Sequence, residues 1–92
     1  LSVKMNPSDG LLAVDRLRSS PPVTIAGRVV VKVEDFKEAN LLRLWLDEVG
    51  GAGVRLQVRP SGTEPKVKLY GEAVDVEAEI LQSLLAALAA IL

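Results

Sequence analysis

Hydrophobic and polar residues alternate with a period of two in two segments of the second half of the chain. Valine and leucine occupy every second position of residues 53–58, and the run 66–70 alternates lysine with an apolar side chain. Such alternation is typical of a strand with one buried face. Residues 59–65 between them contain two prolines and a glycine, which favour a loop. The pattern therefore predicts a strand, a loop and a second strand.

The end of the chain has helical periodicity instead. At about 100° per residue its large aliphatic side chains fall within an arc of roughly 140°, which predicts an amphipathic helix that covers a sheet. The segment is too short and too one-sided to span a bilayer, and its polar face lacks the lysines and arginines of a membrane-surface helix. The arc contains Ile80, Leu81, Leu84, Leu85, Leu88, Ile91 and Leu92.

The first third of the chain predicts a short edge strand over residues 1–5, followed by a helix. Ser8 is a plausible N-cap, and the helix is expected to run to about Arg18 before the two serines and two prolines of residues 19–22. Residues 23–33 are rich in β-branched side chains. They form either one strand with a bulge at Gly27 or two strands that turn near it, and periodicity leaves both alternatives open.

Residues 35–49 are harder to interpret. Asp35 and Glu38 have the spacing of a capping box, and residues 41–46 suit a helix. The apolar positions nevertheless spread around the helical wheel, so a partly irregular linker is the alternative. Trp45 is expected to fill the core or an interface, because buried aromatic residues are the common case, in preference to serving as a platform for a sugar.

The loop at residues 59–65 concentrates groups that bind anions. Arg59 offers a planar fork of donors, and Ser61 and Thr63 offer hydroxyl groups. Gly62 lets backbone N–H groups converge on an anion. The alternative is an ordinary hairpin connection, since the same residues are common in turns.

The charged residues beside the loop are expected to play supporting parts. Glu64 would accept hydrogen bonds from loop N–H groups or pair with a lysine. Lys66, Lys68 and Tyr70 share one strand face, where either lysine adds positive potential or belongs to a solvated surface, and Lys68 is a possible supporting residue for the anion. The role of Tyr70 is left undetermined.

Composition narrows the classes of function. The formal net charge is −1, and the three aromatic residues are scattered singly, so neither a basic surface nor a stacking platform indicates a nucleic acid partner. Cysteine and histidine are absent, and no cluster of carboxylates has metal-binding spacing. No signal peptide is expected, because the start has no charged segment followed by an apolar one. We therefore expect a cytoplasmic protein without a membrane partner and without a cofactor of its own.

The string RPSGTEPKVKLY, residues 59–70, closely resembles the C-terminal phosphate-binding loop of the α-D-phosphohexomutases, the phosphoglucomutase and phosphomannomutase family. The resemblance extends to the flanking strands 53–58 and 66–72 and to the terminal helix within 74–92. It is weaker upstream, at residues 17–23. In that family the loop holds the phosphate of the sugar substrate at the end away from the reacting group.

The predicted fold is α+β: residues 1–92 form one domain with a mainly antiparallel sheet of about four strands and two helices on one face. The resemblance implies the same arrangement, with a topology like that of the TATA-box-binding protein. It also implies that the phosphorylatable serine and the magnesium loop of such a mutase lie in other domains, because 92 residues suffice for one core only.

The resemblance thus implies a terminal domain that is inactive alone, whose partners are a phosphosugar and the other three domains of a mutase. Such a mutase interconverts hexose 1-phosphate and 6-phosphate through a bisphosphorylated intermediate. The expected phosphate ligands are Arg59, Ser61, Gly62 and Thr63. The alternatives are a stand-alone anion-binding module and a structural or oligomerising domain.

Overall fold

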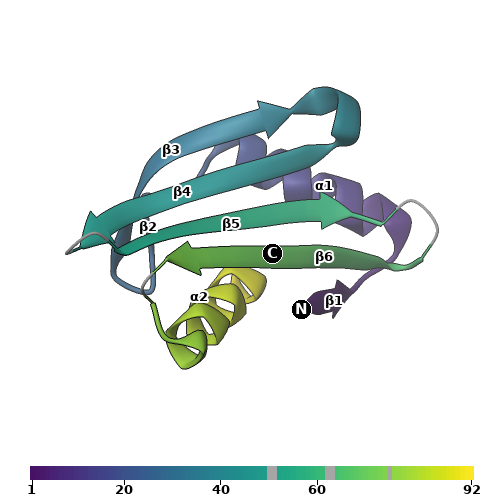
Figure 1. Cartoon of the computed structure of the whole chain (residues 1–92). Coiled ribbons are helices and arrows are strands. Elements are labelled where there is room, and N and C mark those ends of the chain that lie inside the picture. Colours follow the sequence, from purple (N-terminus) through teal and green to yellow (C-terminus); the bar gives the residue numbers. More distant parts are fainter. Residues whose placement is uncertain (50–51, 62–63, 75) are drawn as a thin grey trace.

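The structure, a computed structural model, describes residues 1–49, 52–61, 64–74 and 76–92. Strands dominate, and one helix lies near each end of the chain (Figure 1). In chain order the elements are β1 (Ser2–Lys4), α1 (Pro7–Ser19), β2 (Thr24–Ile25), β3 (Arg28–Phe36), a 3-10 turn (Lys37–Ala39), β4 (Leu41–Val49), β5 (Ala52–Pro60), β6 (Lys66–Val74) and α2 (Ala78–Ala90).

The strands of the described residues form one sheet in the order β1-β6-β5-β4-β3-β2, and every neighbouring pair is antiparallel. The predicted α+β class is confirmed. The sheet has six strands where about four were expected, because residues 41–49 form the strand β4 instead of a helix and residues 24–36 form two strands, β2 and β3.

Both helices pack on one face of the sheet, as predicted, and α1 lies behind the strands in Figure 1. The period of two places one side of each central strand in this core, and the opposite side forms what we call the outer face. Neither helix of the described residues is long and apolar enough to cross a membrane. The core consists mainly of Val14, Leu17, Leu42, Leu44, Leu46, Val54, Leu56, Val58, Val67, Leu69, Leu84, Leu85 and Leu88.

The terminal helix α2 buries the middle of its predicted apolar face. Leu84, Leu85 and Leu88 are at most 4 % exposed. Ile80 and Ile91, near the two ends of the helix and at the same edge of the arc, are 41 % and 50 % exposed. The amphipathic prediction is therefore confirmed for the inner turns.

The N-terminal prediction is confirmed for the strand and corrected for the helix cap. β1 is an edge strand and pairs with β6. The N-cap of α1 is Asn6 and not Ser8: the Asn6 side chain accepts a hydrogen bond of 2.8 Å from the backbone N–H of Asp9. Pro7 takes the first helical position, where its fixed φ and missing N–H suit the helix, so the cap falls on the residue before it.

Residues 23–33 resolve into two strands. β2 and β3 pair across a turn at Ala26 and Gly27, whose φ angles are 49° and 83°. Two consecutive positive φ values are the mark of the tight hairpin turns whose twist matches that of the strands. A register shift also occurs in β3, between Val30 and Lys32, so the bulge that was the alternative lies later in the chain than Gly27.

The helix predicted within residues 35–49 is wrong, and so is the linker alternative. Residues 41–49 form β4, in which Leu42, Leu44 and Leu46 enter the core. Asp35 belongs to β3 and pairs with Arg18 at 2.9 Å instead of capping a helix. The chain turns before β4 through a 3-10 turn and Asn40, whose φ is 50°.

Trp45 does not fill the core. It alternates with the core leucines of β4 and lies half-buried on the outer face. Its indole N–H donates a hydrogen bond to a carboxylate oxygen of Glu34 on β3. The core alternative is wrong, because a large apolar side chain on a strand can be covered by neighbouring polar chains as well as by a core, and the interface alternative stays a prediction.

Candidate anion-binding site

The candidate loop joins the end of β5 to the start of β6. Val58 and Val67, one residue before Arg59 and one before Lys68, are both fully buried. Alternation along each strand therefore directs Arg59 and Lys68 to the outer face, and the two are register partners across the β5–β6 pair. Arg59 is exposed and lies at the rim of the loop.

Backbone hydrogen bonds fold the described part of the loop. The N–H of Ser61 donates to the carbonyl of Lys66 at 2.9 Å, and the N–H of Lys66 donates to the carbonyl of Glu64 at 2.8 Å. The N–H of Met5 donates to the carbonyl of Pro65 at 3.0 Å, which ties the chain after β1 to the loop. The two sides of the loop are thus held together beside Arg59.

The hydroxyl group of Ser61 is also positioned by the loop. Its Oγ accepts a hydrogen bond of 3.2 Å from the backbone N–H of Glu64. A hydroxyl that accepts through a lone pair still has its own hydrogen to donate, so Ser61 remains able to serve as a donor to an anion. Gly62 and Thr63, the other two predicted ligands, lie outside the described residues.

Glu64 pairs with a lysine, one of the two roles expected for it. Its Oε2 lies 2.9 Å from Nζ of Lys66. The hydrogen bond and the charge of Lys66, with a smaller contribution from the charge of Lys68, lower the pKa of Glu64 below its ordinary value of 4.5. Glu64 is therefore a carboxylate at neutral pH and offsets the charge of Lys66.

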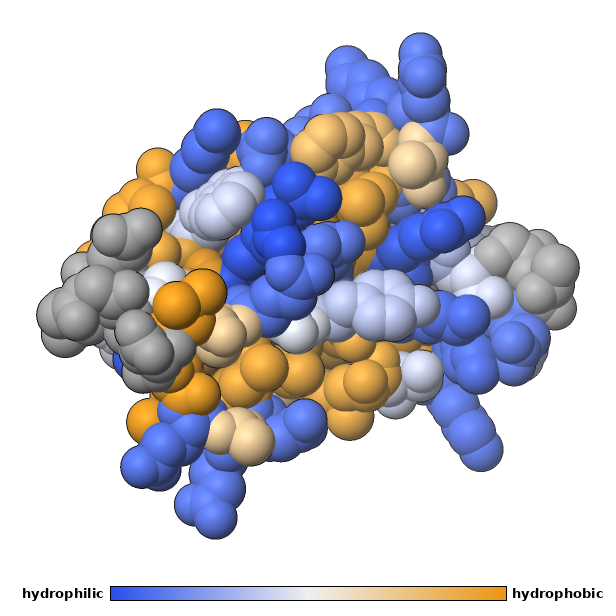
Figure 2. All heavy atoms as spheres, in the orientation of Figure 1, coloured by the Kyte–Doolittle hydropathy of each residue, from blue (hydrophilic) through white to orange (hydrophobic). Residues whose placement is uncertain are grey.

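Further along the outer face, away from the loop, opposite charges are matched. Arg55 on β5 pairs with Glu72 on β6, and Arg43 on β4 approaches Glu34 on β3 at 3.6 Å. The hydrogen bond from the indole of Trp45, followed by the charges of Lys32 and Arg43, lowers the pKa of Glu34. Figure 2 shows polar residues gathered over the strands of this face.

Guanidinium groups cover two of the aromatic rings of the outer face, those of Phe36 and Trp45. Arg43 lies over the ring of Phe36 at 4.8 Å, and Arg55 lies over the ring of Trp45 at 5.2 Å. These contacts occupy one side of each ring with a cation–π interaction. The structure thus gives Trp45 a role in the surface network, and that role leaves less of its ring open for stacking against a sugar.

The loop end of the outer face has an excess of positive charge. Lys66 is offset by Glu64, whereas the described residues provide no ion-pair partner for Arg59 or Lys68. Lys4 on β1 joins them, because it is the register partner of Lys66. No local pattern pointed to Lys4, since only the pairing of β1 with β6 places it beside the loop.

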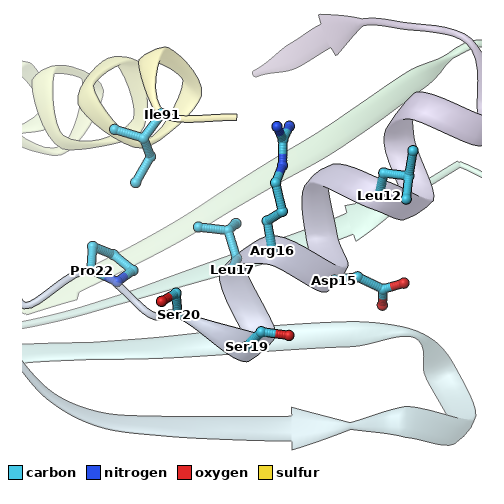
Figure 3. A pocket seen from close by; sticks show the side chains of 8 residues that line it. All are labelled: Leu12, Asp15, Arg16, Leu17, Ser19, Ser20, Pro22 and Ile91. Carbon is cyan, nitrogen blue, oxygen red and sulfur yellow. The ribbon is translucent and has the colours of Figure 1, made fainter.

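A hollow lies elsewhere on the described surface. It has a volume of about 610 Å³ and is found between the end of α1 and the end of α2, where Figure 3 shows Leu17, Pro22 and Ile91 around it. The N-terminal turn of α1 lies beside the loop, since Gly10 packs against Val67 and Pro60. The residues of α1 that line the hollow run from Leu12 to Ser19, toward the C-terminal end of the helix, and none of the lining residues belongs to the loop. It is therefore separate from the candidate anion site.

The described residues contain no group of three or more His, Cys, Asp or Glu side chains that would hold a metal ion. The donors at the loop are instead cationic or neutral: a guanidinium group, lysine ammonium groups and a serine hydroxyl. Such a set suits an anion with several oxygen atoms, to which arginine can present two parallel N–H donors.

Comparison with known proteins agrees with this fold and loop. Residues 6–91 match the family model for the phosphoglucomutase/phosphomannomutase C-terminal domain. This chain therefore belongs to the phosphoglucomutase and phosphomannomutase family and corresponds to the C-terminal domain of that family.

Two curated relatives show how much of a whole protein this domain represents. A probable phosphomannomutase of Haemophilus influenzae is 41 % identical over 61 residues, which cover 62 % of this chain. A phosphoglucomutase of Staphylococcus epidermidis is 34 % identical over 68 residues, which cover 60 % of this chain. In each case the match spans only 12 % of the relative's own length.

Proposed function

We propose that this chain is the substrate-phosphate-binding domain of a phosphosugar mutase that interconverts hexose 1-phosphate and hexose 6-phosphate through a bisphosphorylated intermediate. The domain anchors the phosphate that is not reacting and closes the active site. The observation that carries the proposal is the position of Arg59: it is exposed at the rim of a hydrogen-bonded loop, and the described residues provide no carboxylate partner for it.

The chemistry of anchoring follows from the donors. Arg59 grips two phosphate oxygens through its planar fork, and the hydroxyl of Ser61 donates to a third. Hydrogen bonds to a charged group contribute roughly 1.5–3 kcal/mol each, so a few of them hold the substrate without contacts to its ring. Gly62 and Thr63 complete the proposed ligand set. Recognition of the phosphate alone suits a loop that must bind the 1-phosphate and the 6-phosphate in turn.

Catalysis in this proposal is shared with the rest of a longer enzyme. The domain contributes positioning, which holds the sugar in line for transfer. The phosphorylated serine and the magnesium ion belong to the other domains, consistent with the small share of its relatives' length that this chain spans. The partners of this chain are accordingly the phosphosugar and the three remaining domains of the mutase.

Titration of the chain with phosphate tests the proposal. Amide NMR spectra recorded with inorganic phosphate, glucose 1-phosphate and glucose 6-phosphate should show shifts centred on residues 59–64. We expect dissociation constants no tighter than about 1 mM, equivalent to roughly 4 kcal/mol, because half of the closed site is missing. The three ligands should differ little.

A matched pair of variants makes this titration specific. Arg59→Lys should weaken binding, whereas Arg55→Lys should not, although both residues lie on the outer side of β5 and both changes keep the charge. Arg55 is already engaged with Glu72. Shifts centred away from the loop, a strong preference for one sugar, or equal effects of the two variants would contradict the proposed function.

A further inference from the structure

We propose that the N-terminal strand β1 supplies part of the phosphate site: Lys4, together with Lys68 on β6, attracts the dianionic phosphate ester toward Arg59. This inference rests on the proposed function and extends it to residues outside the loop. The assigned roles differ. Arg59 binds phosphate oxygens, Lys68 stands beside it, and Lys4 acts at longer range.

The geometry that carries the inference is the pairing of three strands. On β1, Val3 is half-buried and packs against the core opposite Val67, so alternation directs Lys4 to the outer face. Lys4 is the register partner of Lys66, and Arg59 is the register partner of Lys68. The outer sides of three neighbouring strands thus present cations at the same end of the sheet.

The hydrogen bond from Met5 to Pro65 fixes this arrangement. It links the residue after Lys4 to the loop itself at 3.0 Å. The N-terminus adds two bonds to β6, since Leu1 both donates to and accepts from the backbone of Leu69. Strand β1 is therefore anchored on both sides of Lys4, which keeps its ammonium group near the loop.

The charge at this end contrasts with that of the remainder of the chain. Glu64 offsets Lys66, so the local excess is the three charges of Lys4, Arg59 and Lys68. The whole chain has a formal net charge of −1, so the remaining residues have a net charge of −4. An anion that approaches the domain is thus repelled by most of it and attracted to the loop end of the outer face.

Distance separates the effects of the three cations. Strands lie about 4.8 Å apart and residues rise about 3.3 Å along a strand, so the Cα atoms of Lys4 and Arg59 are roughly 12 Å apart. An interaction over this distance is largely screened at about 0.1 M salt, where the Debye length is about 10 Å. A bidentate contact of Arg59 is screened much less. Raising the salt concentration should therefore remove the long-range attraction by Lys4 and leave most of the direct contact of Arg59.

The experiment measures the dissociation constant of inorganic phosphate by NMR for the intact chain and for Lys4→Gln, Lys68→Gln and Lys32→Gln. Lys32→Gln is the matched control, because Lys32 is an exposed lysine of the outer face that lies opposite Trp45, several residues further along the strands from the loop. Each variant removes one positive charge. The titrations are run at ionic strengths of about 30 mM and about 500 mM.

At about 30 mM, Lys4→Gln should weaken phosphate binding by about two- to fourfold and Lys68→Gln by at least as much, whereas Lys32→Gln should change it by less than about 1.5-fold. At about 500 mM the effect of Lys4→Gln should disappear. A Lys4→Gln effect equal to that of the control at low salt would overturn the inference and leave the proposed function standing. Absence of phosphate binding by the unaltered chain would overturn the proposed function and this inference with it.

Discussion

Arg59 lies directly across from Lys68 on the antiparallel pair β5–β6, and both side chains are on the outer face. Like charges in directly opposed positions of a sheet destabilise the folded state. The next pair of charged residues across β5 and β6 on the same face, Arg55 and Glu72, has opposite charges instead. The repulsive pair is thus confined to the end of the sheet where an anion is proposed to bind.

We therefore expect Lys68→Gln to stabilise the free chain while weakening its binding of phosphate. Removal of the repulsion should raise the free energy of unfolding by roughly 0.2–1 kcal/mol. Urea unfolding without phosphate, compared with the unaltered chain, measures this change. A variant that is less stable than the unaltered chain would show that Lys68 supports the fold instead.

Arg59→Lys in a full-length mutase that contains this domain should lower activity without unfolding the protein. The charge is kept and the planar fork is lost, so kcat/KM should fall roughly tenfold to a thousandfold, or about 1.4–4 kcal/mol. Both sugar phosphate isomers should be affected, because each uses the loop in one orientation. Thermal melting should shift little, since Arg59 is exposed. Full activity toward both isomers would exclude the anchoring role.

The chain by itself should fold but show no mutase activity. Its helices and strands share one continuous core, and the described residues contain no metal-binding group of side chains to support phosphoryl transfer. An assay with glucose 1-phosphate, magnesium and a bisphosphate activator should give background turnover, while circular dichroism confirms the fold. Turnover at the rate of an intact enzyme would mean that the chain holds a complete active site.

The hydrogen bond between Trp45 and Glu34 should make stability depend on pH. The indole of Trp45 and the nearby cations lower the pKa of Glu34 in the folded state below 4.5. The resulting stabilisation is present above the unfolded pKa and is lost as the pH falls through the folded value. The stability advantage of the unaltered chain over Glu34→Gln should therefore shrink between about pH 6 and about pH 3. Urea unfolding followed by Trp45 fluorescence measures it, and a constant difference would contradict the assignment.

Gly71 should be intolerant of larger residues. A Cβ atom at this position of β6 would lie 2.8 Å from Cδ1 of Leu81 on α2 and 3.2 Å from Cδ2 of Leu56. Gly71→Val should therefore destabilise the chain by roughly 1–3 kcal/mol through overpacking, as measured by urea unfolding. The smaller Gly71→Ala should cost less when combined with Leu81→Ala than the two single changes predict together. Strict additivity would show that α2 does not pack on Gly71.

Periodicity predicted those elements in which one face is cleanly apolar. The strands around the loop and the inner turns of α2 alternate or repeat without interruption, so their buried sides follow directly from sequence. In β4 the same period of two is present at Leu42, Leu44 and Leu46, but Leu41 and Trp45 are apolar as well. These two residues occupy positions where alternation would place polar side chains, so the period of two is hard to recognise. Only the pairing of this segment with β3 and β5 makes it a strand.

Some residues of the candidate site could be predicted from local sequence, and others could not. Arg59 and Ser61 were predicted from a local string of residues, and the outward direction of Lys66 and Lys68 from alternation. The proximity of Lys4 depends on contacts between residues more than sixty positions apart in the chain. No local pattern specifies such a pairing, because a three-residue strand can join either edge of a sheet equally well by sequence alone.

The register shift in β3 has a consequence for edge-to-edge pairing between copies of this domain. Beyond its short pairing with β2, β3 has no strand partner on that side among the described residues, and Val31 and Val33 are 62 % and 37 % exposed. Long apolar edges of this kind invite a strand from another molecule, and a bulge discourages this because it disrupts the regular spacing of backbone groups. Val31 is the residue left out of register. Deletion of Val31 is therefore expected to give neighbouring copies a more regular edge to pair with and to raise the tendency of the domain to aggregate.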